Sequence, residues 1–242
     1  MADGSAPKNS DLGTRAASAV VMVAIAGTAL WLGGTVWAVF VALIATGVYY
    51  EWAQLAGRFE SRAARRLLWM TGGFLYIALA AFMLLKLRIG PFGTARTLLL
   101  VGVVVATDIG AYFAGRTFGG PKIAPAISPS KTWAGLIGGA VGATAVLTAY
   151  FYWFLCFDPA FGHCALQSLS MALPRALLGG MAVAVIAQAG DFFESWMKRR
   201  AGVKDSGNLI PGHGGLFDRV DGLLALAFVL GLLSLHSLVS PT

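Results

Sequence analysis

The sequence predicts an all-α fold, a polytopic bundle of about seven transmembrane helices with its N-terminus in the cytoplasm. Hydrophobic residues fill 57% of the 242 positions and charged residues only 12%, whereas soluble domains carry roughly 25% charged residues. The apolar residues form continuous runs instead of the alternating pattern of a membrane barrel. Because backbone groups in lipid must be hydrogen-bonded within each segment, continuous runs favour helices.

Seven runs reach or approach the roughly 20 apolar residues that cross the hydrocarbon layer. They follow a polar tail at residues 1–15 and cover residues 16–32, 35–53, 67–85, 97–115, 133–155, 173–190 and 222–239. Only Gly33 and Gly34 separate the first two runs. One uninterrupted helix of that length would exceed the bilayer, so a tight hairpin is expected there.

Lys and Arg cluster in the loops after the second, fourth and sixth runs. Loops of this kind face the cytoplasm, so the N-terminus is expected inside and the C-terminus outside. Lys86, Arg88 and Arg96 fall on the opposite side and oppose this orientation, but the three other loops outweigh them. The net charge of +7 therefore reports orientation, and no nucleic-acid partner is expected.

Both cysteines, Cys156 and Cys164, lie at the predicted outer loop. An oxidising compartment there would permit a disulfide between them. Two small apolar residues at a membrane boundary are an equally good interpretation.

Charged residues are concentrated between positions 191 and 221. If the sixth helix continues into this window, Asp191, Ser195 and Lys198 share one helix face. A carboxylate, a hydroxyl and an ammonium on one face suit a hard metal ion that carries phosphate. The alternative is a solvated helix end with an Asp to Lys attraction. Glu194 lies beside this face and is assigned no role.

Asp218 and Asp221 open the seventh helix three positions apart and also share a face. They are interpreted as carboxylates that meet Asp191 and complete a site for one or two cations. The alternative makes Asp218 an N-cap and Asp221 a first-turn acid favoured by the helix dipole.

His213, Gly214 and Gly215 directly precede that helix. Glycines let backbone N–H groups approach a phosphate, and the following helix N-terminus favours an anion. A tight turn accounts for the glycines nearly as well, and His213 is either a phosphate donor or an ordinary loop histidine.

A second polar cluster, with Ser128, Lys131 and Thr132, precedes the fifth helix. A lysine and hydroxyl groups at a helix start suit a triphosphate, although these residue types are also common N-caps.

Asp108 lies well inside the fourth run, with Tyr112 and Arg116 on the same side of the helix. An intramembrane carboxylate is a functional candidate by default. The alternative is an internal bond from Asp108 to Tyr112 or Arg116 that fixes helix packing.

The segment from Ser195 to Asp221 resembles the signature of the phosphatidate cytidylyltransferase family, also called CDP-diacylglycerol synthases. The matching positions are Ser195, Lys198, Arg199, Lys204, Asp205, Gly207, Pro211, His213, Gly214, Gly215, Asp218, Arg219 and Asp221. The upstream segment SPSKTWAG is similar to the family's SPKKTWEG, with Ser130 and Ala134 in place of a Lys and a Glu. The likeness covers the chain from about Asp108 onward.

This resemblance implies an enzyme that transfers a cytidylyl group from CTP to phosphatidate, releases pyrophosphate and requires Mg2+, with a second cation as a further expectation. It implies catalytic roles for Asp191, Lys198, Asp218, Arg219 and Asp221, with Asp191, Asp218 and Asp221 as metal ligands. The residues expected to bind CTP or phosphate are Ser128, Lys131, Thr132, Ser195, Arg199, Lys204, Asp205, His213, Gly214 and Gly215, with Asp108 as a further candidate.

The chain is expected to be one integral domain, residues 1–242, in which helices at residues 16–107 precede a catalytic portion at residues 108–242. Its expected location is the cytoplasmic membrane, with the active site on the cytoplasmic face. CTP, phosphatidate and membrane lipid are the expected partners. The glycine-rich segment at residues 135–142 permits close helix contact, either within one chain or across a homodimer.

Two other functions fit parts of the pattern. A CTP-dependent lipid kinase of the polyprenol or phytol type would share the nucleotide and the membrane substrate. An ion-coupled secondary transporter would use Asp108 and Asp191 at broken helices. The basic, glycine-rich loop fits a transporter poorly, because it lies at the membrane edge instead of the midplane.

Overall fold

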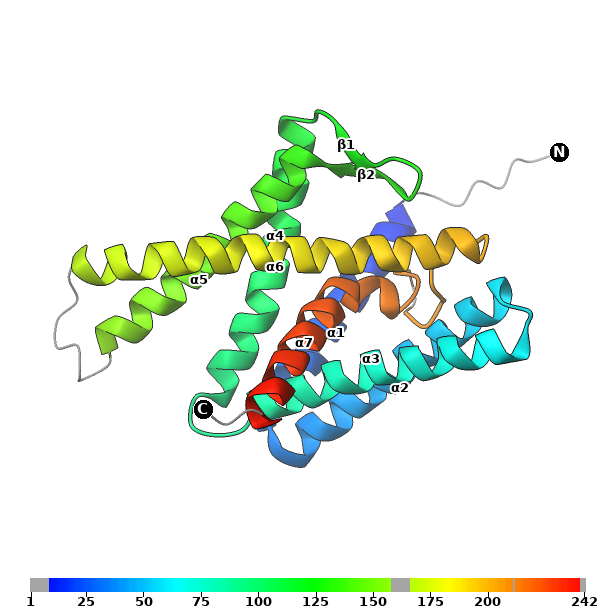
Figure 1. The fold of residues 1–242 in the computed structure, drawn as a ribbon, viewed down its shortest axis with the longest axis horizontal. Coiled ribbons are helices and arrows are strands. Elements are labelled where there is room, and N and C mark those ends of the chain that lie inside the picture. The colour runs from blue at the N-terminus through cyan, green and yellow to red at the C-terminus, as the bar shows by residue number, and fades with distance from the viewer. Residues whose placement is uncertain (1–8, 158–165, 211, 240–242) are drawn as a thin grey trace.

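The computed structural model describes residues 9–157, 166–210 and 212–239, and within them the chain forms seven helices and one β-hairpin (Figure 1). The helices are α1 (Asn9–Leu32), α2 (Gly34–Phe59), α3 (Ala63–Leu87), α4 (Gly93–Thr117), α5 (Trp133–Phe157), α6 (Leu166–Arg200) and α7 (Phe217–Val239). The hairpin pairs β1 (Lys122–Ala124) with β2 (Ser128–Thr132) in antiparallel fashion. The helical prediction is therefore confirmed, with a small hairpin added to it.

Six of these helices, α2 to α7, are long and apolar enough to cross a membrane. The apolar part of α1 is shorter, Ala16–Leu32. Cys164 lies outside the described residues, so its pairing with Cys156 stays a prediction.

Helix α6 departs most from its expected bounds, because it continues past residue 190 to Arg200. Its 35 residues span about 52 Å at 1.5 Å per residue, against roughly 30 Å of hydrocarbon. The helix therefore projects beyond the apolar layer. Beyond Arg200 the chain turns at Gly202, whose φ of 69° lets the Val203 N–H return to the Lys198 carbonyl at 3.0 Å.

The expected hairpin between the first two helices is present at Gly33, whose φ is 63°. A Cβ atom there would lie 2.6 Å from the Arg88 guanidinium, so a larger residue would displace that side chain and would also be strained at this positive φ. The Arg88 Nε atom donates to the Leu30 carbonyl at 3.0 Å and satisfies a carbonyl in the last turn of α1. This basic residue on the side expected to be poor in Lys and Arg thus has a structural role.

Helices α4 and α5 approach each other most closely at glycines. A Cβ on Gly138 would lie 2.5 Å from the Gly110 carbonyl oxygen, and one on Gly142 would lie 2.3 Å from the Ala106 oxygen. These glycines therefore serve contacts within one chain. The predicted homodimer is not needed to account for them and stays a prediction.

The loops that follow α2, α4 and α6 are gathered at one end of the bundle (Figure 1). The Arg199 Nε atom donates to the Ile127 carbonyl at 3.4 Å, which links α6 to the hairpin segment. The Arg200 guanidinium lies 5.4 Å from the centre of the Phe59 ring at the end of α2. The three loops rich in Lys and Arg therefore share one end of the molecule.

Candidate active site

Two glycines bring α6 and α7 into close contact near that end. A Cβ atom on Gly190 would lie 2.6 Å from the Asp221 carbonyl oxygen, and one on Gly222 would lie 3.4 Å from the Ala187 side chain. Because no side chain separates the helices at this crossing, the neighbouring residues Asp191 and Asp221 meet across it. Their carboxyl groups lie within hydrogen-bonding reach of each other.

Lys131 on β2 extends into this crossing and forms an ion pair with the Asp191 carboxylate. Burial alone lowers the pKa of the Lys131 ammonium, but the Asp191 carboxylate and two further carboxylates raise the pKa above its ordinary value. The two further carboxylates are Asp108 and Asp221. Lys131 is therefore positively charged at neutral pH.

Asp108 belongs to the same group, although it comes from the middle of α4. It lines a narrow crevice together with Lys131, Gln188 and Asp191. Arg116, its possible partner, donates instead to the Tyr112 hydroxyl at 2.7 Å. Asp108 is therefore held beside Asp191 and not in a packing bond along its own helix.

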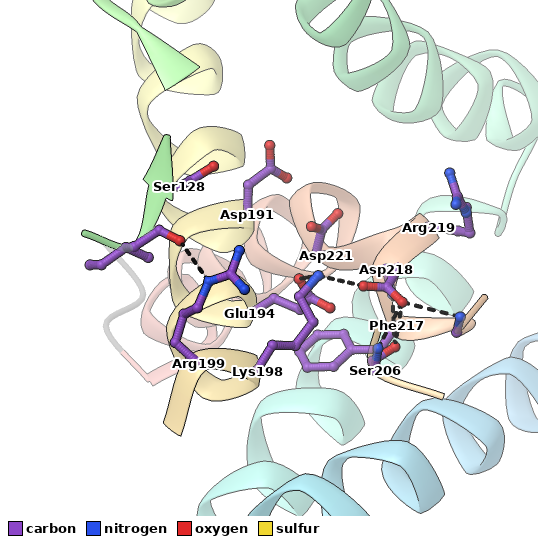
Figure 2. Close-up of polar contacts among 12 residues, drawn as sticks. Ser128, Asp191, Glu194, Lys198, Arg199, Ser206, Phe217, Asp218, Arg219 and Asp221 are labelled. Carbon is purple, nitrogen blue, oxygen red and sulfur yellow. Dashed lines mark hydrogen bonds and ion pairs between the residues drawn. The ribbon is translucent and has the colours of Figure 1, made fainter. Parts of the chain in front are cut away.

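A second charged group lies two helical turns further along α6 (Figure 2). The Lys198 ammonium contacts the Glu194 carboxylate at 2.6 Å and the Asp218 carboxylate at 2.5 Å. Glu194 is only 1% exposed, and its Oε1 atom has no hydrogen-bond partner among the described residues. Figure 2 shows Asp221 between Asp191 on one side and the Lys198 and Asp218 pair on the other.

The second oxygen of Asp218 is held by the loop that precedes α7. It accepts hydrogen bonds from the Ser206 backbone N–H at 2.9 Å, the Ser206 hydroxyl at 3.0 Å and the Gly215 N–H at 3.1 Å. A Cβ atom on Gly215 would lie 1.9 Å from the Ser206 hydroxyl, so only glycine fits there. The loop is thus folded around the Asp218 carboxylate.

Glu51 on α2 fixes the start of α7 from the other side. Its carboxylate accepts the backbone N–H groups of Leu216 at 2.9 Å and Phe217 at 2.8 Å, and the Ser206 hydroxyl at 2.9 Å. The side chain is 1% exposed. The orphan N–H groups of a helix start, which an anion could otherwise bind, are satisfied here by a carboxylate of the protein itself.

Residues 61–236 match a sequence model described as the cytidylyltransferase family. The chain belongs to this family. The matched range contains the Asp191 to Asp221 crossing, the Lys198 cluster and the crevice at Asp108. It also begins well upstream of Asp108, so the family likeness extends further toward the N-terminus than the sequence motifs indicated.

Curated relatives of this cytidylyltransferase are similar over most of its length. A phosphatidate cytidylyltransferase of Brucella suis is 35% identical over 270 residues, which cover 91% of this chain and 92% of that protein. One from Rickettsia bellii is 33% identical over 224 residues, 92% of this chain and 90% of that protein. One from Pseudomonas aeruginosa is 36% identical over 214 residues, 86% of this chain and 71% of that protein.

The expected meeting of three metal-binding carboxylates needs a correction. The described part of this cytidylyltransferase contains no group of three His, Cys, Asp or Glu side chains placed to hold one metal ion. Asp191 and Asp221 are together, but Asp218 is occupied by Lys198 and by its own loop. The physical reason is the spacing along α6, where Asp191 and Lys198 are about 10 Å apart along the helix axis. Asp191 therefore meets Asp221, whereas Lys198 meets Asp218.

The phosphate-binding role expected of the glycine loop stays a prediction, although several donors of the loop are engaged within the protein. The Gly215 N–H donates to Asp218, and the first N–H groups of α7 donate to Glu51, so these donors are already engaged. Gly214 has a φ of 81°, which a glycine supplies without strain. The loop is therefore a tight turn in this structure, which is the alternative weighed from the sequence.

His213 and Arg219 lie at the outer edge of the site. The His213 Nδ1 atom is 2.8 Å from the Ser18 hydroxyl of α1, and the Arg219 guanidinium donates to the His213 carbonyl at 2.6 Å. Arg219 is exposed. The positive charge of Arg219 therefore remains accessible to an anion that approaches from the solvent.

Of the residues predicted at the start of α5, Thr132 and Ser128 have local contacts, whereas Lys131 extends to the charged crossing. The Thr132 hydroxyl accepts the Gly135 N–H at 3.0 Å, which makes Thr132 the N-cap of α5. Ser128 is buried and its hydroxyl lies 3.5 Å from that of Ser130. Only Lys131 reaches the charged crossing.

Within the described part of the chain, four other predicted phosphate-binding residues make no side-chain hydrogen bond or ion pair with the two carboxylate groups. Ser195 is half-buried and has no side-chain hydrogen bond among the described residues, while Arg199, Lys204 and Asp205 are exposed at the end of α6 and in the following loop. Their roles toward the nucleotide stay predictions.

Glu51 was not predicted as a site residue from the sequence, and Glu194 was named there without a role. Both are nearly fully buried in the structure. Glu51 interrupts an apolar run that was interpreted only as a membrane span, although an intramembrane carboxylate is a functional candidate by default. The same rule that selected Asp108 could have found it.

Proposed function

We propose that this protein transfers a cytidylyl group from CTP to phosphatidate and so forms CDP-diacylglycerol and pyrophosphate. The observation that carries the proposal is the pair of lysines, Lys131 and Lys198, held by carboxylates on either side of Asp221 at one end of a membrane bundle. The lysines can contact phosphate groups, and the surrounding carboxylates can hold the cation that accompanies a nucleoside triphosphate beside a lipid surface. The names of the relatives point to the same reaction.

The reaction needs no protein nucleophile. An oxygen of the phosphatidate phosphate attacks the α-phosphorus of CTP, the bond from that phosphorus to the bridging oxygen breaks, and pyrophosphate leaves with that oxygen. The protein therefore acts by positioning the two substrates and offsetting their charge. Lys131 and Lys198 offset the charge on the triphosphate, and exposed Arg219 meets the phosphate of the lipid.

The residues at the crossing fit a hard divalent cation. Asp191 and Asp221 bring two carboxyl groups together, and the Glu194 Oε1 atom is a buried oxygen without a partner among the described residues. Oxygen ligands of this kind suit Mg2+. Asp191 and Asp221 would hold the ion, which when bound neutralises charge on the phosphates in the transition state. A second cation stays an expectation.

The site is expected to face the cytoplasm. The three loops rich in Lys and Arg lie at the same end of the bundle as the charged crossing. Loops of this composition remain on the cytoplasmic side of a membrane. CTP is available on that side, so the location in the inner membrane and the chemistry agree.

Labelled CTP tests the proposed reaction. Purified protein is mixed with phosphatidate and Mg2+, and the CTP carries its label at either the α- or the γ-phosphate. We expect the α-label on the lipid and the γ-label in pyrophosphate. Transfer of the γ-label to lipid would identify a kinase instead. Reactions without Mg2+, and reactions with the Asp191→Asn variant, should form no labelled lipid.

A further inference from the structure

A second feature of the membrane-spanning part is an apolar chamber between α1, α2, α3, α4 and α7, with a volume of about 370 Å³ and an open side toward the bilayer at Val23 and Leu98. We call it the α1 chamber, and its lining includes Gly27, Leu30, Trp37, Ala45, Ala81 and Val220. All of its lining residues are apolar. The single polar atom of the Trp37 ring is turned to the Leu84 carbonyl, to which it donates at 3.3 Å.

An apolar chamber of this volume is expected to be occupied by another molecule or by part of one. Protein interiors pack closely, and an empty cavity destabilises the fold in proportion to its volume. Water does not fill the space, since a buried water needs polar partners that this lining lacks. Inside a bilayer, the chamber can then be occupied by lipid hydrocarbon.

The end of the chamber that Val220 lines adjoins the charged site. Val220 lines the chamber in the first turn of α7, and its chain neighbours are Arg219 and Asp221. Arg219 is exposed, and its guanidinium donates to the His213 carbonyl. A positive charge above an apolar chamber complements a lipid with an anionic phosphate above its acyl chain.

Helix α1 contributes Val23, Gly27 and Leu30 to the lining of the chamber and is tied to the site near its N-terminal end. The Ser18 hydroxyl lies 2.8 Å from the Nδ1 atom of His213. Gly27 is nine positions further along α1 and therefore about 14 Å below Ser18 along the helix axis. The chamber thus continues from the level of the phosphate-binding residues deep into the hydrocarbon layer.

We propose that the α1 chamber holds one acyl chain of the lipid substrate and makes the enzyme sensitive to the length of that chain. The proposal rests on the function proposed above. A long chain passes Gly27, whereas the chains of dioctanoyl phosphatidate end above it. A larger residue at position 27 therefore shortens the chamber for long chains alone.

Gly27 allows a direct test, because a Cβ atom there would meet nothing within 4 Å. Gly27→Leu should therefore fill the chamber without a clash. Gly72→Leu is the matched control. Gly72 is also a helix glycine with nothing within 4 Å of its Cβ position, and it lines a separate apolar groove between α3, α6 and α7.

The measurement is kcat/KM for dipalmitoyl phosphatidate relative to dioctanoyl phosphatidate, in mixed micelles. We expect Gly27→Leu to lower this ratio by roughly tenfold or more, and Gly72→Leu to keep it at the wild-type value. An unchanged ratio in Gly27→Leu, or a selective loss in Gly72→Leu, overturns the proposal. Gly27→Ala, a smaller change with a smaller expected shift in the same direction, serves if the leucine variant unfolds below the assay temperature.

Assays of the wild-type enzyme distinguish failure of the chamber proposal from failure of the proposed reaction. Formation of CDP-diacylglycerol from the dioctanoyl substrate by the wild type, with an unchanged ratio in the variants, rejects the chamber and leaves the reaction intact. Failure of the wild type with both substrates rejects the proposed function and the chamber with it.

Discussion

The Glu51 carboxylate on α2 accepts the backbone N–H of Phe217 at 2.8 Å, although 166 positions separate the two residues. Phe217 is the first residue of α7, which carries Asp218 and Asp221. A carboxylate at a helix N-terminus satisfies orphan donors and is favoured by the helix dipole. The N-terminal helices therefore do more than anchor the chain, since one of them sets the position of the acids at the site.

Replacement of this carboxylate should disturb the site from a distance. In Glu51→Gln, one oxygen becomes an amide nitrogen that cannot accept, so the backbone N–H of either Leu216 or Phe217 loses its partner. An unpaired buried donor costs about 1–3 kcal/mol, and each 1.4 kcal/mol that the transition state shares corresponds to about tenfold in rate. We expect a lower melting temperature in detergent and a lower kcat, with CTP still binding.

Glu60→Gln is the control for that variant. Glu60 pairs with Arg65 at 3.6 Å in the turn between α2 and α3. The Arg65 side chain is 53% exposed, and a pair of this kind contributes roughly 0–1 kcal/mol. Equal losses of kcat in the two variants would show that Glu51 has no special place in the site.

The Asp221→Asn variant separates activity from stability. Asp221 lies beside the Asp191 carboxylate, and its own Oδ1 atom accepts the Gly222 N–H at 2.9 Å. Asparagine can keep that hydrogen bond while removing a negative charge from a crowded pair. We expect turnover to be lost and the melting temperature to stay level or rise. Wild-type turnover with an unchanged Mg2+ titration would exclude Asp221 as a metal ligand.

Loss of Lys198 should have two separable effects. In Lys198→Met, the Glu194 and Asp218 carboxylates lose their shared cation, and breaking a buried pair in this way costs about 3–5 kcal/mol. Adding Glu194→Gln removes one of the two uncompensated charges. The double variant should therefore regain melting temperature but not turnover. Regained turnover would make Lys198 a structural residue only. Lys122→Met, at an exposed position of β1, is the control for charge alone.

Lys131 should strengthen CTP binding equally at neutral and at mildly alkaline pH. Its pKa is raised above the ordinary lysine value of about 10.4. The Lys131 to Asp191 pair therefore contributes its stabilisation fully below that ordinary value and loses it only as the pH rises through the higher folded pKa. We expect Lys131→Met to raise the KM for CTP, and by the same factor at each pH from ~7 to 9. A factor that falls toward one within this range would contradict the assignment.

Much of the fold follows from local patterns in the sequence. Apolar runs located the helices, and two glycines located the first hairpin. The continuation of the sixth helix past residue 190, which the sequence offered as a possibility, is present in α6. These features depend on residues that are neighbours along the chain. The same holds for Thr132, whose capping role is a local hydrogen bond to Gly135.

The site was harder to predict, because its contacts join distant segments. The i to i+3 spacing placed Asp218 and Asp221 on one face, but it could not show that Ser206 and Gly215 would enclose Asp218. Nor could helix periodicity reveal that Glu51 reaches α7 from α2. Side-chain partners across helices depend on crossing points, which the glycines Gly190 and Gly222 set only once the fold is known.

The close contact between α4 and α5 makes a last prediction about stability. A Cβ atom on Gly138 would lie 2.3 Å from the Ala114 Cβ and 2.5 Å from the Gly110 oxygen, so Gly138→Ala must push the helices apart. Overpacking of this kind costs about 1–3 kcal/mol. Gly102→Ala on the same face of contact is the control, since its Cβ would meet Val146 at 3.9 Å, an ordinary contact. We expect a lower melting temperature for Gly138→Ala alone. Because α4 carries Asp108 and α5 follows Lys131, the separation should also lower turnover, and equal stability of the two variants would show that the helices do not pack as described.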